Sequence, residues 1–272
     1  MSEYQYYEFQ AIDRALTTKE IAILRSCSTR ATITPTSFVN HYEYGSFKGD
    51  EDEWMDRYFD AFMYTANWGT NVLKLRLPAE QLPLSEVQAY AADNVLDARK
   101  KRGNVIVTFA SDDETVDSNE EQSSLSSLVS IRHELLRGDR RALYLGWLAG
   151  VQNEVVDEDE LEPEVPAGLR QLSATLAALV EFLRIDESLV AVASRKSAPL
   201  PPAPSRRAVT KWVKQLPAPT KDALLARIVN DDPAAASEVR QKFHSDQRPI
   251  ARSAQRKPRT AGMLLEAAHG SR

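Results

Sequence analysis

The sequence predicts an α+β fold, in which an N-terminal module of mixed strands and helices is followed by an all-α bundle and a disordered basic tail. Three observations support this prediction. Alternation of apolar and polar residues, typical of half-buried strands, is confined to the first 111 residues. Apolar residues at helical spacing recur from residue 124 onward. From residue 246, arginines lie among proline, serine and glutamine, as in chains that do not pack a core.

Changes of composition divide the chain into six predicted parts. Two of these parts are linkers, one rich in acidic residues and one rich in proline, and neither composition favours a packed core. The parts are the α+β module (1–111), an acidic linker (112–123), the helical bundle (124–194), a Pro-rich linker (195–207), a short helical segment (208–245) and a basic tail with a short docking helix (246–272).

The N-terminal module begins with a strand and a helix. Thr17, with Glu20 three residues later, forms a capping box and predicts a helix over residues 18–28. Stretches rich in aromatic and β-branched residues predict strands on both sides of this helix. These strands are expected at residues 4–12, 31–34 and 38–44.

Helical spacing is clearest from Glu51 to Ala66, where two rows of large side chains form one wide apolar stripe. The rows are Trp54, Tyr58 and Phe62, and Met55, Phe59 and Met63. Asp50 is expected to cap the start of this helix, and Gly69 is expected to follow its end. Alternating leucines and cations over residues 72–77 then predict a half-buried strand.

Residues 95–98 and 105–109 are expected to form a hairpin, because Gly103 and Asn104 favour the positive φ angles of a tight turn. The turn between them carries four consecutive cations: Arg99, Lys100, Lys101 and Arg102. These are candidate contacts for nucleic acid or an acidic partner. The simpler explanation is a solvated turn that keeps a sheet edge from aggregating.

The helical bundle is predicted from amphipathic stretches that begin and end at recognisable residues. Gly138 is expected to end the first helix, Asp139 to cap the second and Asp186 to cap the fourth. Gly146 and Gly150 lie four residues apart within the second helix. Because glycine costs about 1 kcal/mol against alanine in a helix interior, this pair predicts close packing against a neighbouring helix.

Composition excludes several classes of protein. The net charge of −5 gives no global argument for nucleic-acid binding. Cys27 is the single cysteine, which excludes an internal disulfide framework and a multi-cysteine zinc site. No apolar run reaches transmembrane length, and the first residues lack the pattern of a signal peptide. We therefore expect a cytoplasmic protein with no membrane partner.

Candidate catalytic residues lie in the loop region Ser37–Gly49. His41 and Glu43 share one face if this stretch is a strand, and Asn40 lies beside them. An acid–base pair of a hydrolase-like enzyme is then conceivable. The simpler explanation is that the aromatic residues of the loop cover the apolar stripe of the neighbouring helix. The chain contains no phosphate-binding glycine loop, dinucleotide fingerprint, nucleophile elbow or HExxH motif, and we predict no cofactor and no metal site.

The basic tail contains one apolar stretch, residues 260–268, that predicts a short helix. A helix of about two turns is marginal in water unless it packs against something. It is expected to dock either on this protein or in the groove of a partner, with Met263, Leu264 and Leu265 as contact residues.

Four segments of the chain resemble those of an uncharacterised family of bacterial cytosolic proteins. The segments are YQYYEFQAIDR (4–14), ITPTSFVN (33–40), ANWG (66–69) and ALYLGWL (142–148). The resemblance covers about residues 4–245. It implies a bacterial cytosolic setting, and it brings no activity, substrate or catalytic residue.

Three functional hypotheses remain. The first is a protein-interaction or adaptor protein that docks an unidentified protein partner through its C-terminal tail, since low motif content argues against chemistry. The second is a small-molecule enzyme with its site in the Ser37–Gly49 loop. The third is a nucleic-acid-associated factor that uses residues 99–102 and the basic tail.

Overall fold

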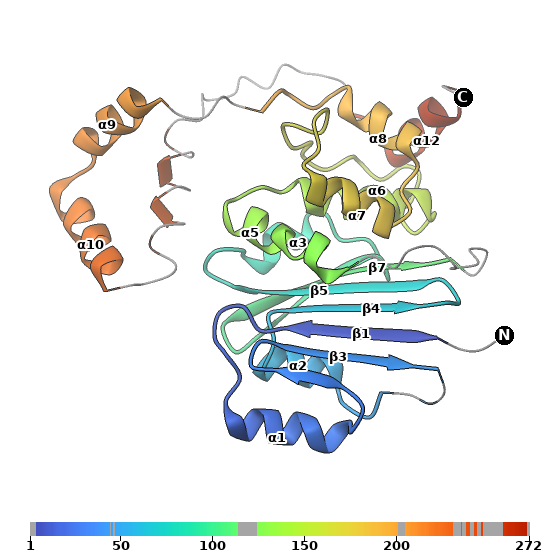
Figure 1. Cartoon of the computed structure of the whole chain (residues 1–272). Helices are drawn as coiled ribbons and strands as arrows, with labels where there is room; N and C mark the ends of the chain where they lie inside the picture. Colours follow the sequence, from blue (N-terminus) through green and yellow to red (C-terminus); the bar gives the residue numbers. More distant parts are fainter. Residues whose placement is uncertain are drawn as a thin grey trace.

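A computed structural model confirms the α+β class. It describes residues 4–43, 45, 47–113, 124–200, 205–230, 235, 238–239, 242–243, 246 and 258–270. The N-terminal part is a seven-stranded antiparallel sheet with helices, and the rest of the described chain is mostly helical (Figure 1). The predicted acidic linker, apart from Asp112 and Asp113, lies outside the described residues.

The sheet has the strand order β2-β3-β1-β4-β5-β7-β6. Its strands are β1 (Gln5–Gln10), β2 (Thr32–Thr34), β3 (Ser37–Tyr42), β4 (Ala61–Ala66), β5 (Thr70–Pro78), β6 (Leu96–Lys101) and β7 (Asn104–Asp112). Every pairing between neighbours is antiparallel. The strands expected at the N-terminus, after residue 31 and over residues 72–77 are confirmed.

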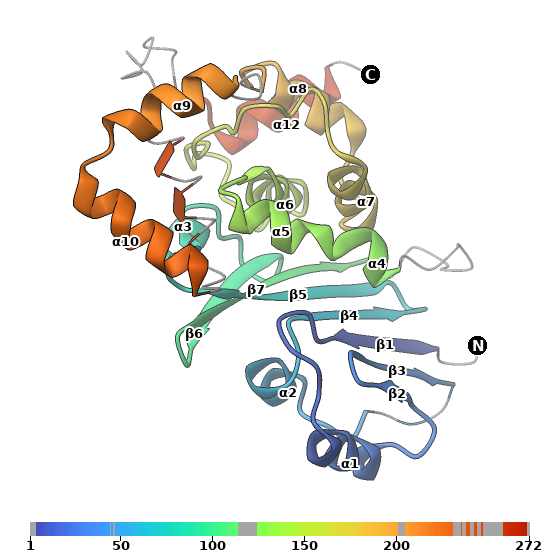
Figure 2. The same ribbon diagram turned by 60° about the vertical axis from the view of Figure 1, so that its left-hand side comes forward.

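Helices cover both faces of the sheet (Figure 2). On one face, α1 (Thr18–Cys27) and α2 (Glu51–Arg57) enclose a small core of aromatic rings, which includes Phe9, Phe38 and Trp54. The capping box that begins α1 is confirmed, and Asp50 caps α2 as expected.

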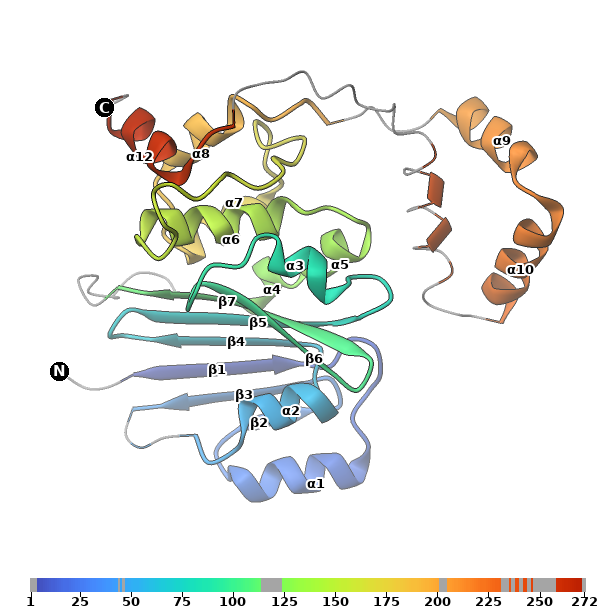
Figure 3. The same ribbon diagram turned by 180° about the vertical axis from the view of Figure 1, so that it is seen from behind.

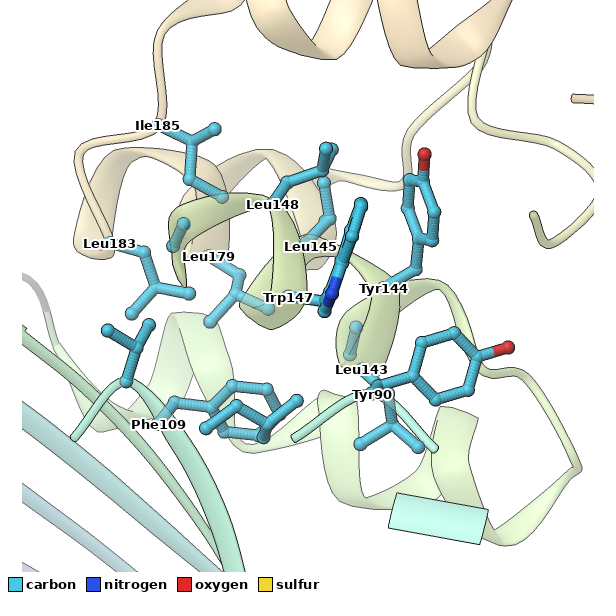
Figure 4. Close-up of a cluster of buried hydrophobic side chains, with 14 of the residues drawn as sticks. Tyr90, Phe109, Leu143, Tyr144, Leu145, Trp147, Leu148, Leu179, Leu183 and Ile185 are labelled. Atoms are coloured by element: carbon cyan, nitrogen blue, oxygen red, sulfur yellow. The ribbon is translucent and has the colours of Figure 1, made fainter. Parts of the chain in front are cut away.

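On the other face, a larger core lies between the sheet and a second set of helices; we call the sheet and the helices on its two faces the body. The helices of this second set are α3 (Leu84–Gln88), α4 (Leu125–Leu128), α5 (Ser130–Leu136), α6 (Arg141–Gln152), α7 (Ala174–Phe182), α8 (Glu187–Ser194) and α12 (Ala261–His269). Helix α6 is buried along almost its whole length, and Trp147 and Tyr144 project from it into this core (Figure 4). The predicted bundle therefore shares one hydrophobic core with the sheet.

The two glycines of α6 allow it to lie close to the sheet edge. A Cβ atom at Gly150 would meet the Cβ of Ala92 at 2.3 Å, and one at Gly146 would meet Leu96 at 3.0 Å. Close packing of α6 against a neighbouring helix was predicted. The neighbours at the two glycines are instead β6 and the segment before it. Leu96 begins the edge strand that α6 crosses.

The prediction of one helix from Glu51 to Ala66 is wrong beyond Arg57. Residues 61–66 form β4, which pairs with β1 on one side and β5 on the other. Both faces of this central strand are covered, so its apolar residues form a continuous run without alternation. Phe62 and Met63 matched a helical stripe, although the two side chains enter opposite cores.

Two turns also differ from expectation. Gly69 lies in the turn between β4 and β5, with a φ of +98°, and ends no helix. The β6–β7 hairpin is confirmed, but its turn is made by Arg102 and Gly103, whose φ angles are +51° and +80°. Because β6 continues through Lys101, three of the four predicted turn cations lie on a strand.

Asp60 joins several elements at one end of the sheet. Its buried carboxylate accepts hydrogen bonds from the backbone amides of Ile12 and Asp13 at 2.6 and 2.9 Å. It also accepts one from Nη2 of Arg76 at 2.6 Å. Arg132 of α5 bonds to the carboxylate of Asp13 and to the carbonyl of Arg76. Burial raises the pKa of Asp60, but the Asp13 amide and the Arg76 charge outweigh it and hold that pKa below its usual range.

Replacing Asp60 with asparagine is expected to lower the free energy of unfolding by about 3–5 kcal/mol, because the largely buried Arg76 loses its counter-charge. Urea-induced unfolding at pH 7 measures the change. Asp52→Asn is the matched control on the exposed side of α2 and should cost less than about 1 kcal/mol. Equal losses in the two variants would contradict this role of Asp60.

The same carboxylate predicts a pH dependence of stability. Because the pKa of Asp60 is lower in the folded state than in the unfolded chain, its stabilisation is complete above about pH 4. The stabilisation is lost as the pH falls from there through the folded-state pKa. Urea unfolding between pH 5 and pH 2 should show a smaller loss for Asp60→Asn than for the natural protein. Parallel curves would show that Asp60 does not titrate on unfolding.

Candidate functional site

The structure separates the candidate catalytic residues. His41 lies near the end of β3 and is exposed; its Nδ1 is 2.6 Å from the hydroxyl of Tyr4, and its ring lies 4.8 Å from that of Tyr6. Asn40 points to the opposite face, is 4% exposed and donates to Oγ of Ser28 at 3.0 Å. Asn40 therefore ties β3 to the end of α1.

Glu43 does not complete an acid–base pair with His41. Strand β3 ends at Tyr42, so Glu43 lies beyond it as an exposed residue. The expected face shared by His41 and Glu43 depended on a strand that continued to residue 44. Within the described residues, no hydrogen bond joins the two side chains.

The cations of β6 are largely engaged by α2. Nη1 of Arg99 and Nζ of Lys101 lie 2.8 and 2.7 Å from the carboxylate of Asp56. Arg99 also lies 3.5 Å from Asp52. Asp52, Asp56 and Asp60, from α2 and the residues that follow it, all form ion pairs with cations of the sheet. Lys100 and Arg102 are the members of this run that lie outside these ion pairs.

The predicted tail helix is present and docks on the protein itself. Helix α12 packs against α8 and α6 (Figures 1 and 3). Leu264 is fully buried in the larger core, Leu265 is partly buried against it, and Met263 is 53% exposed. Of the two dockings expected from the sequence, the structure shows the intramolecular one.

A buried ion pair holds this C-terminal segment. The Glu162 carboxylate is 3% exposed and accepts from Nε and Nη2 of Arg259 at 3.0 and 2.5 Å. It also accepts from the hydroxyl of Tyr144 at 2.6 Å and from Nζ of Lys196 at 3.1 Å. Burial raises the pKa of Glu162, but Arg259, Tyr144 and Lys196 together lower it below its usual range.

Backbone pairing extends this contact, which we call the clasp. The amide of Glu162 donates to the carbonyl of Arg259 at 2.8 Å, and the amide of Ala261 donates to Glu160 at 3.0 Å. Nη1 of Arg259 donates to the carbonyl of Val192 in α8 at 3.1 Å. Arg259 was expected in a disordered tail, because nothing in the local sequence shows that its partner lies 97 residues earlier.

Between α8 and α12 the chain leaves the body. Helices α9 (Arg206–Gln215) and α10 (Ala218–Val229) lie in this excursion, and we call residues 205–230 the arm. Figures 1 and 3 show the arm away from the sheet and its covering helices. Because the clasp fixes the chain again at Arg259, the arm is attached to the body at both ends.

Both helices of the arm carry large apolar side chains that are exposed to solvent. Val213, Leu225, Ile228 and Val229 are between 41% and 78% exposed. Trp212 is buried, packs edge-on against Phe243 and donates from Nε1 to Asp246 at 2.9 Å. A surface hollow of about 210 Å³ lies beside it. Its lining residues are Trp212, Gln215, Leu216, Pro217, Lys242 and Asp246.

The arm is also strongly basic. Residues 205–230 contain six Lys and Arg against one Asp, hence a net charge of +5, which leaves −10 for the rest of the chain. Five of the cations make no ion pair with any residue that the structure describes: Arg206, Arg207, Lys211, Lys214 and Lys221. The net charge of the whole chain conceals this basic segment, whereas a count of charges over short windows reveals it.

The described residues contain no group of three or more His, Cys, Asp or Glu side chains arranged to hold a metal ion. Over the same residues, no helix is both long enough and apolar enough to cross a membrane. Comparison with family models, curated proteins and solved structures finds no match to this chain. The resemblance to an uncharacterised bacterial family therefore stays a prediction.

Replacing Arg259 with methionine is expected to loosen α12, because the buried Glu162 loses its bidentate partner while side-chain length is kept. Hydrogen–deuterium exchange over residues 258–270 should quicken by about 100-fold, equivalent to about 3 kcal/mol of local opening. Arg137→Met, at an exposed site, is the control and should leave this exchange unchanged. Unaltered exchange in Arg259→Met would mean that apolar packing alone holds the segment.

Proposed function

We propose that this protein is a non-enzymatic interaction protein of the bacterial cytoplasm, and that it binds an acidic protein partner through the arm. The observation that carries the proposal is the combination of exposed apolar side chains and unpaired cations on α9 and α10. The contact region moves from Met263–Leu265 to the arm, because Leu264 is already buried against this protein's own helices.

The apolar residues favour a protein over a nucleic acid as the partner. Val213, Leu225, Ile228 and Val229 gain free energy only when apolar surface covers them, at about 25 cal/mol per Å² buried. A phosphate backbone attracts the cations but offers little to these side chains. Binding to a nucleic acid would therefore engage the cations of the arm and leave its apolar side chains uncovered.

The charge of the arm defines the partner further. Five cations on two short helices, which pair with none of the residues that the structure describes, attract a surface with clustered carboxylates and raise the rate of encounter with it. Exposed ion pairs contribute little affinity individually, about 0–1 kcal/mol each. The apolar residues supply the affinity, and the cations select an acidic protein.

The enzyme hypothesis has less support. His41 and Asn40 lie on opposite faces of β3, and Glu43 lies beyond the strand. A hydrolase at this place needs a nucleophile or an activated water between groups that converge. On the arm, exposed apolar side chains lie on the same two helices as five cations that pair with no described residue.

A photo-crosslinking amino acid placed at Ile228 tests the proposal in the cells that make this protein. The expected result is a discrete adduct with an acidic protein, resistant to nuclease, which disappears when Lys211 and Lys214 are both changed to Glu. The same amino acid at Ile23, an equally exposed apolar site on α1, is the matched control. Nuclease-sensitive adducts, or identical adducts from positions 228 and 23, would reject a protein partner for the arm.

A further inference from the structure

Large exposed apolar side chains gather in two places on this protein. Four of the eleven in the described residues lie on the arm. Three others, Val155, Leu161 and Met263, belong to the two segments that the clasp joins. The remaining four are Ile12, Ile23, Trp68 and Leu200, on separate segments of the chain.

We call Val155, Leu161 and Met263 the clasp patch. Leu161 forms a β-bridge with Thr260, three residues before Met263. The amide of Gly262 donates to the carbonyl of Glu158 at 2.9 Å, which places the start of α12 against residues 158–162. These contacts bring Leu161 and the start of α12 together, although the two lie far apart in the sequence, and Val155 lies three residues before Glu158 on the same segment as Leu161.

Carboxylates flank the apolar residues of the clasp patch. Asp157, Glu158, Asp159 and Glu160 are exposed and make no ion pair with any described residue. The patch therefore combines apolar side chains with unpaired negative charge, and the arm combines apolar side chains with unpaired positive charge. The two surfaces are therefore opposite in charge, and both carry exposed apolar side chains.

We propose that a second copy of this chain is a partner of the arm, which docks on the clasp patch of that copy. This inference rests on the function proposed above and names the acidic protein. Val213, Leu225, Ile228 and Val229 cover Val155, Leu161 and Met263, and the cations of α9 face the carboxylates of residues 157–160. Since each copy carries both surfaces, two reciprocal contacts close a dimer.

The position of the arm favours a second copy over the same chain. Figures 1 and 3 show α9 and α10 at one end of the molecule and α12, which carries Met263, at the other. Val155, Leu161 and Met263 are exposed, so the arm of the same chain does not cover its own clasp patch. The arm of a second molecule has access to that patch.

Exchange of charge between the two surfaces tests the inference with the full-length protein. The arm variant carries Arg206→Glu, Arg207→Glu, Lys211→Glu and Lys214→Glu. The patch variant carries Asp157→Arg, Asp159→Arg and Glu160→Arg. All of the substituted residues are exposed or half-exposed, so both variants should unfold at the temperature of the natural protein.

Sedimentation equilibrium measures the association of each protein. The natural chain should dimerise, and its dissociation constant should rise by about tenfold or more between about 0.05 and 0.5 M salt. Each variant alone should bind itself at least about tenfold more weakly, through repulsion of like charges. An equimolar mixture of the two should regain the affinity, since each acidic arm then meets a basic patch and each basic arm an acidic one.

Three results would overturn the inference. One is a natural chain that stays monomeric at all concentrations; if the adduct from Ile228 with another acidic protein persists, the proposed function stands without a second copy. Another is a dimer whose affinity is the same in both variants and in their mixture, which would place the contact elsewhere. A monomer that becomes more compact at low salt would show docking within one chain and counts against the inference.

Discussion

The contact between Arg259 and Glu162 is the constraint on which the arrangement of the C-terminal half depends. A guanidinium that reaches a buried carboxylate 97 residues earlier in the chain fixes the segment after the arm to the body. Together with the packing of α12 on α8 and α6, it holds the chain on the body after the arm. With it, the arm is a loop held at both ends, and its apolar and basic residues are displayed from a defined place.

The arm and the rest of the chain also differ in charge. The arm carries +5 while the rest of the chain carries −10, and the carboxylates of residues 157–160 lie next to the clasp. Ion pairs inside the body, such as Arg76 with Asp60 and Arg99 with Asp56, are satisfied locally and leave little charge for recognition. The cations of the arm and the carboxylates of residues 157–160 lie on segments that also carry exposed apolar side chains, which is the composition of a protein interface.

Much of the fold was predictable, because strands that are covered on one face alternate and helices have local caps. β5 and the Thr17 capping box were found in this way. β4 was not, because burial on both faces removes alternation and leaves a helical-looking run. The candidate site was less predictable. Asn40 was taken for a site residue although its partner is Ser28, and Arg259 was assigned to solvent, since both contacts join residues distant in sequence.

The most direct test of this account asks whether the clasp holds the chain without its covalent connection. A protease site introduced within residues 247–257 allows the full-length folded protein to be cut between the arm and α12. The account predicts that the C-terminal fragment elutes with the rest of the protein on size-exclusion chromatography at about 10 μM, as a bound segment with submicromolar affinity would. A fragment that separates on cutting would contradict it, because the arm would then have one fixed end.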